Sequence, residues 1–149
     1  MKTSLRTVPD TNVIIAAQNS NPTSPNKEFF SRWQNEEFVL LFSNDTLGEY
    51  VKKLIERQIP RERIRQLIIA IKRKGEKIEI QYFHFAKYPI DRDDIAFVLC
   101  AENGYATHLI SYDKHLLDLQ GFYSFKICKT VDFLTELRQI LAGSNNNME

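Results

Sequence analysis

Three aspartates in this sequence stand where a carboxylate needs a partner. Asp10 follows a short β-type run and precedes an apolar helical run, and Asp113 also follows a β-type run. Asp94 heads an apolar helical segment, where it shares a face with Phe97 and Val98. An unpaired buried carboxylate costs several kcal/mol, so each of these groups must meet a cation, hydrogen-bond donors or water.

Two of these aspartates also have a simpler interpretation as helix caps. Asp10 can cap the helix that follows it, and Asp113 can cap a helix over residues 114–119. A cap explains the residue type without any chemistry. The functional interpretation therefore depends on whether the aspartates meet in the fold.

The chain alternates short β-type runs with helical patterns, and it has no internal repeat. Strands are predicted to end at Val8, Phe42, about Phe83, Ile110 and Cys128. Helices are predicted near residues 27–34, 43–58, 60–75, 91–104 and 131–141. This alternation indicates a Rossmann-like, three-layer α/β/α fold with a five-stranded parallel sheet. We expect one domain over residues 1–141 and a flexible tail over residues 142–149.

The predicted fold brings the three aspartates together. Asp10 and Asp113 follow adjacent strands, and Asp94 begins a helix at the same edge of the sheet. Hard oxygen ligands suit Mg²⁺ or Mn²⁺, so a divalent cation site is expected there. Rival sites are missing from the sequence, because the three histidines are scattered and the five glycines form no phosphate-binding loop.

Four stretches in this order resemble a known family. They are Val8-Pro9-Asp10-Thr11-Asn12-Val13-Ile14, Leu47-Gly48-Glu49-Tyr50, Asp91-x-x-Asp94 and Leu109-Ile110-Ser111-Tyr112-Asp113. Within one α/β domain they look like the PIN-domain nucleases, and more narrowly the putative toxin subfamily of prokaryotic toxin–antitoxin systems. The similarity runs over about residues 5–141.

The resemblance implies a site and an activity. The metal-binding and catalytic residues would be Asp10, Glu49, Asp94 and Asp113. The accessory residues would be Asp91 or Asp93 beside Asp94, with Thr11, Asn12 and Ser111 as polar groups that steady the carboxylates. Such enzymes use Mg²⁺ or Mn²⁺ to hydrolyse RNA phosphodiesters, leaving a 5′-phosphate. The partners that the resemblance implies are RNA, a protein antitoxin and a second copy of the chain in a homodimer.

Two residues differ from the family pattern, and a third has a position that the helical periodicity does not explain. Pro9 removes one ladder N–H just before Asp10. Tyr112 replaces a small residue and is expected to narrow the mouth of the site. Glu49 lies nearly opposite the apolar stripe of its helix, so periodicity alone predicts solvated surface. It reaches the site only if it lies in the first turns of that helix.

The charge of the chain is unevenly distributed. The net charge is +1, but residues 52–77 hold ten Lys or Arg against three Glu, a local charge of +7, so the remainder carries −6. Candidate contacts to the RNA backbone are Lys52, Lys53, Arg61, Arg65, Lys72 and Arg73. This segment can equally be solvated helix surface or a surface for an acidic antitoxin.

Two other functions remain open at this point. One is an inactive PIN-like module that binds RNA or a protein partner. The other is an α/β phosphatase with Asp10 as nucleophile, although Asn12 stands where a haloacid-dehalogenase motif has a second Asp.

The cellular compartment is also predicted from the sequence. No apolar run approaches the roughly 18 residues that a membrane span needs, and the amino terminus lacks a signal-peptide core. Cys100 and Cys128 have apolar neighbours and no metal-binding spacing, which predicts buried thiols in a reducing compartment. A cytoplasmic protein without membrane contact is expected.

Overall fold

A five-stranded parallel sheet forms the centre of the structure, a computed structural model that describes residues 2–19, 21–82, 84, 85 and 87–147. The strands are β1 (Arg6–Pro9), β2 (Val39–Phe42), β3 (Glu76–Lys77), β4 (His108–Ile110) and β5 (Lys126–Cys128). Their order is β3-β2-β1-β4-β5, so β1 lies between β2 and β4. The predicted neighbours β1 and β4 are therefore confirmed.

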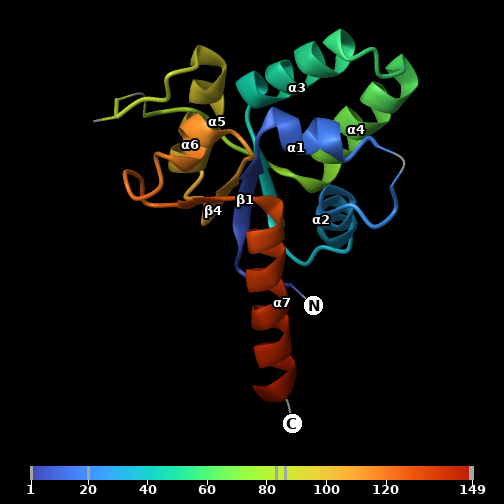
Figure 1. The fold of residues 1–149 in the computed structure, drawn as a ribbon, viewed down its shortest axis with the longest axis vertical. Coiled ribbons are helices and arrows are strands. Elements are labelled where there is room, and N and C mark those ends of the chain that lie inside the picture. Colours follow the sequence, from blue (N-terminus) through green and yellow to red (C-terminus); the bar gives the residue numbers. More distant parts are fainter. Residues whose placement is uncertain (1, 20, 83, 86, 148–149) are drawn as a thin grey trace.

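Helices cover both faces of this sheet, as the predicted three-layer α/β/α fold requires (Figure 1). They are α1 (Thr11–Ala16), α2 (Pro25–Gln34), α3 (Asn44–Glu56), α4 (Arg61–Lys74), α5 (Arg92–Asn103), α6 (Lys114–Leu117) and α7 (Thr130–Asn147). Helix α5 packs on β1, β2 and β4, while α2 packs against α7. No helix in the described ranges is long and apolar enough to cross a membrane.

The core forms because each strand and helix has an apolar face to bury. Phe29 of α2 and Phe133 of α7 lie with ring centroids 5.6 Å apart, and both contact the ring of Phe38. Tyr50 of α3 and Phe97 of α5 lie 5.7 Å apart and join the helices that flank the acidic edge. Burial of large aromatic side chains supplies much of the stabilisation of such a core.

The third strand is shorter than predicted. The sequence pattern favoured a strand over residues 77–83, but β3 comprises only Glu76–Lys77, and Phe83 lies outside the described residues. The Asn103 side chain accepts hydrogen bonds from the N–H groups of Gln81 and Tyr82, at 2.9 and 2.7 Å, and donates to the Tyr82 carbonyl. A side chain therefore satisfies the backbone groups that a neighbouring strand would have paired.

The last helix is longer than predicted. We expected it to end near Leu141, whereas α7 continues to Asn147 and extends beyond the rest of the molecule (Figure 1). The flexibility expected for residues 142–149 stays a prediction. A second difference concerns the thiols, since Cys100 is buried but Cys128 only partly so.

Candidate metal-binding site

An acidic hollow of about 170 Å³ lies at the edge of the sheet where β1 and β4 end. This acidic hollow is formed by the ends of the β-strands and by the amino-terminal turns of α1, α3 and α5. Its lining residues are Asp10, Thr11, Asn12, Glu49, Lys53, Asp91, Asp93, Asp94, Phe97 and Asp113. All four predicted metal-binding residues are therefore brought together.

Two hydrogen bonds hold the Asp10 carboxylate in place. Its carboxylate is 3% exposed, accepts a hydrogen bond from the Val13 N–H at 3.2 Å, and accepts another from the Ser111 hydroxyl. Ser111 Oγ in turn accepts from the Asp113 N–H at 2.9 Å. One buried serine therefore links the end of β1 to the turn after β4, and it fixes the relative positions of Asp10 and Asp113.

Both aspartates at the strand ends also cap helices. Asp10 caps α1, and Asp113 caps α6 by accepting from the His115 N–H at 2.9 Å. The simpler interpretation from the sequence is therefore correct, but it is not the whole explanation. Each cap uses only some of the carboxylate lone pairs, and the same carboxylates face the acidic hollow.

Glu49 and Asp94 contribute the least satisfied atoms of the site. Asp94 lies in the first turn of α5 and is 9% exposed, and Glu49 lies in the second turn of α3. Glu49 Oε2 and Asp94 Oδ2 are buried, and neither has a hydrogen-bond partner among the described residues. Buried carboxylate oxygens without donors are costly, so their natural complement is a cation.

The protonation behaviour of these acids has one shared cause. Burial raises the pKa of Asp10 to about 6, against the hydrogen bonds from Ser111 and from the start of α1. Burial and the neighbouring Asp113 raise the pKa of Asp94 well above its usual range. The pKa of Glu49 is also raised, first by burial and then by repulsion from Asp93. The acidic hollow is therefore short of positive charge.

The donor set fits a hard divalent cation, because every strong donor is a carboxylate oxygen. Within the described ranges, no three Asp, Glu, His or Cys side chains are already grouped around one cation position. The fit therefore rests on the two unpartnered oxygens and on the chemistry of the donors.

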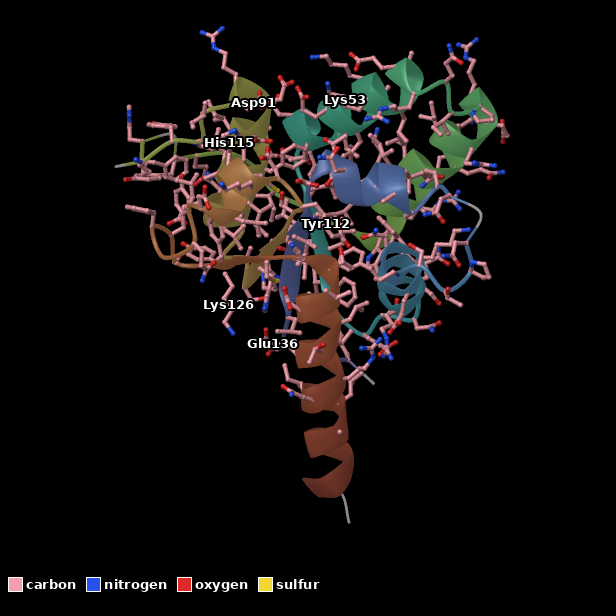
Figure 2. All side chains as sticks on the ribbon, viewed as in Figure 1. Lys53, Asp91, Tyr112, His115, Lys126 and Glu136 are labelled. Carbon is pink, nitrogen blue, oxygen red and sulfur yellow. The ribbon has the colours of Figure 1, made fainter. Side chains whose placement is uncertain are left out.

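The accessory residues occupy different positions. Asp91 caps α5 by accepting from the Asp93 N–H at 2.9 Å, and its side chain stands at the rim (Figure 2). Asp93 also lines the acidic hollow, so both candidates for the accessory acid lie at the site. The expectation for Tyr112 was wrong: its hydroxyl donates to Asn26 Oδ1 at 3.3 Å, which turns it toward α2 and away from the mouth.

The predicted RNA-binding cations are spread over the molecule. Lys53 lines the acidic hollow, and Lys52 Nζ lies 4.0 Å from Asp93 Oδ2. Arg61 and Arg65 are exposed in the first turns of α4. Lys72 and Arg73 lie in its last turn. Of the six cations, only Lys53 lines the acidic hollow.

One positioning residue was missed from the sequence. Tyr50 is fully buried, and its hydroxyl donates to the carbonyl of Pro9. This bond ties α3 to the end of β1, so it places Glu49 beside Asp10. The only available indication was a single tyrosine in an otherwise aliphatic stripe, next to an acidic residue.

The fold and the acidic hollow define a class of protein: this chain belongs to the PIN domain family, whose sequence model matches residues 6–115. Among solved structures, a chain in the crystal structure of VapBC2 from Rickettsia felis, bound to a DNA fragment from their promoter, is similar. The match has 14% identity and a TM-score of 0.56, and it covers 83% of this chain and 97% of that chain. At this identity the likeness shows the fold. No curated protein matches significantly.

Proposed function

We propose that this protein is a metal-dependent endoribonuclease, acting as the toxin of a toxin–antitoxin pair. The observation that carries the proposal is the pair of buried, unpartnered carboxylate oxygens, Glu49 Oε2 and Asp94 Oδ2, in a hollow that also contains Asp10 and Asp113. A site of this composition suits divalent cations and the phosphate groups they bind.

The roles of the residues follow from their positions. Asp10, Glu49, Asp94 and Asp113 would hold Mg²⁺ or Mn²⁺, which supplies an acidified water and neutralises charge on the phosphate. Ser111 orients Asp10 and the turn that carries Asp113. Glu49 is less buried than Asp94, so water reaches it more easily, which suits a group that orients the attacking water.

The biological role is supported by the family and by the structural neighbour. That neighbour comes from a complex named VapBC2, bound to its own promoter DNA. By analogy, we propose RNA as the substrate, an antitoxin as the protein partner, a homodimer as a possible assembly and the cytoplasm as the location. Lys52 and Lys53, which stand at the acidic hollow, are the cations best placed to hold an RNA backbone.

The test is RNA cleavage by purified protein with Mg²⁺ or Mn²⁺. Asp10→Asn and Asp94→Asn should each lower the cleavage rate at least about a hundredfold, and EDTA should abolish cleavage. Asp132→Asn, at an exposed aspartate in the first turn of α7, is the matched control and should cleave like the parent.

Two outcomes would contradict the proposal. Equal cleavage by the parent and Asp94→Asn would remove the catalytic assignment. RNA binding without cleavage at any cation concentration would favour the inactive binding module. For the toxin role, expression of the parent should arrest growth, and Asp94→Asn should relieve the arrest while Asp132→Asn should not.

A further inference from the structure

A second hollow, with aromatic walls, lies directly beside the acidic one. We call it the aromatic hollow; it encloses about 280 Å³, and the residues that matter here are Lys87, Tyr88, Ile90, His115 and Phe122. Ile90 is 80% exposed, Phe122 61% and Tyr88 42%. Large apolar side chains gathered in one exposed place mark a binding surface.

Residues that are neighbours in the chain or joined by a hydrogen bond line the two hollows. Ile90 precedes Asp91, which lines the acidic hollow, so their Cα atoms are about 3.8 Å apart. On the other wall, the His115 N–H donates to Asp113 Oδ1 at 2.9 Å. His115 and Asp91 are labelled on the same side of the molecule in Figure 2. A ligand held at the acidic hollow can therefore extend into the aromatic one.

The aromatic hollow is built in advance of any ligand. The hydroxyl of Tyr123 donates to the Lys87 carbonyl at 2.6 Å, which fixes one wall to the loop that carries Phe122. The rings of Phe85 and Tyr88 lie 5.4 Å apart, and those of Phe85 and Tyr123 lie 5.8 Å apart. This chain of ring contacts holds the exposed aromatic faces in position, which lowers the entropy cost of binding.

The chemistry of the walls suits a nucleobase. Lys87 Nζ lies 5.5 Å from the centroid of the Phe122 ring, so a cation and an aromatic face stand together. Sites for whole drug-sized ligands occupy roughly 300–1,000 Å³, so 280 Å³ suits a single ring system. Aromatic faces beside a basic group are the means by which proteins hold the bases of single-stranded RNA.

We propose that the aromatic hollow binds one nucleobase of single-stranded RNA, next to the phosphate that the acidic hollow cleaves. This inference rests on the proposed nuclease function and adds a subsite to it. Phe122 supplies the stacking face, Lys87 lies beside the phosphate backbone, and Ile90 closes the wall nearest the cleaved bond. Base preference of the enzyme is then set here and not by the carboxylates.

The test measures binding of a short fluorescent single-stranded RNA to the full chain in EDTA, where cleavage cannot occur. Phe122→Ala should weaken binding about tenfold, since stacking on one base contributes roughly 1–3 kcal/mol. Phe122→Trp should restore it, whereas Phe122→Leu, which is apolar but has no π face, should not. Tyr105→Ala is the control, because Tyr105 is 85% exposed and lies outside both hollows.

A double-mutant cycle that combines Phe122→Ala with abasic RNA shows whether the aromatic hollow binds a base. Removing one base at a single position should weaken binding to the parent, and it should cost nothing further in Phe122→Ala, because both changes remove the same contact. Additive losses at every position would overturn the subsite. Equal RNA binding by the parent and by Phe122→Ala would also overturn the subsite. This holds even if Phe122→Ala loses its binding to the co-expressed product of a neighbouring gene.

The same experiment separates this inference from the proposed function. If the parent cleaves RNA and Phe122→Ala changes neither affinity nor KM, only the subsite is wrong. Another outcome is that the parent never cleaves RNA, while the binding losses caused by Phe122→Ala and by the abasic RNA are not additive. In that case the base site is supported and the nuclease function is wrong. If both hold, Phe122→Ala should raise KM about tenfold and leave kcat within about twofold.

Discussion

The two edges of the sheet hold their acidic side chains in opposite ways. At the edge where the strands begin, Glu76 pairs with Arg6, and Glu136 pairs with His108 at 2.7 Å and with Lys126 at 3.3 Å. The Arg6 hydrogen bond lowers the pKa of Glu76, and His108 and Lys126 lower the pKa of Glu136 although burial opposes them. Each of these acids therefore has a cationic or hydrogen-bonding partner.

At the edge where the strands end, Asp10, Glu49 and Asp94 have no such partners among the described residues, although Lys52 Nζ lies 4.0 Å from Asp93 Oδ2. Burial raises the pKa of Asp10, Glu49 and Asp94, and two of their oxygens have no hydrogen-bond partner in the described part of the chain. The fold therefore tolerates an electrostatic cost at one edge that it avoids at the other. Such a cost is typical of a site kept for a ligand and not for stability.

Among variants that keep every carboxylate of the site, the largest expected effect comes from removing the serine that joins the two strand-end aspartates. Ser111→Ala should lower the rate of RNA cleavage about 10- to 100-fold, as is usual for a group that orients metal ligands. The carboxylates themselves remain, so added Mn²⁺ should recover part of the rate. Ser124→Ala, at an exposed serine, is the control in the same assay. An unchanged rate in Ser111→Ala would mean that Asp10 needs no positioning.

Matched acid-to-amide changes at the two edges should alter stability with opposite signs. In metal-free protein near pH 8, Asp94→Asn should raise the free energy of unfolding by about 1–3 kcal/mol, because it removes a buried, unpaired charge. Glu136→Gln should lower it by about 1 kcal/mol, because it weakens bonds to His108 and Lys126. Urea denaturation measures both, and two changes of the same sign would break the comparison.

The pH dependence of the same variants sharpens the comparison. Asp94 has a raised pKa in the folded state, so the native chain takes up a proton before the unfolded chain does, and the advantage of Asp94→Asn should shrink as the pH falls from 8 to 5. Glu136 has a lowered pKa, so its contribution persists above about pH 4.5 and is lost only below it. Parallel curves for the two variants would contradict the account.

The smallest expected effects concern the basic residues. Lys53→Gln should weaken binding of single-stranded RNA and lower its salt dependence by about 0.7 log units, the value for one phosphate contact. Lys72→Gln, in the last turn of α4 and outside the acidic hollow, should change neither the affinity nor the salt dependence. Binding isotherms at several salt concentrations test both, and equal losses would mean that the RNA also contacts the end of α4.

Sequence patterns predicted the sheet and the strand-end aspartates because these follow from local rules. Asp10 and Asp113 each end a short apolar run, and parallel strands bring such ends to one edge. Asp94 was placed on a buried helical face by periodicity alone, and it is 9% exposed. These inferences required no knowledge of distant contacts.

The sequence patterns were least informative about residues whose environment is set by distant parts of the chain. Glu49 seemed solvated by periodicity, and only the crossing of α3 over the end of β1, fixed by Tyr50, brings it to the acidic hollow. The third strand is shorter than predicted because Asn103, more than twenty residues away, accepts the hydrogen bonds of the Gln81 and Tyr82 N–H groups. Tyr112 turned away because Asn26 offers it an acceptor. None of these contacts leaves a pattern in the local sequence.

The central claim is that the unpartnered acids form a cation site, and the most direct measurement is calorimetric titration of metal-free protein with Mn²⁺. The account predicts that the parent and Asp132→Asn bind Mn²⁺ with the same affinity, whereas Asp94→Asn binds at least about tenfold more weakly. Equal affinities for all three proteins, or no binding by the parent at millimolar Mn²⁺, would contradict it.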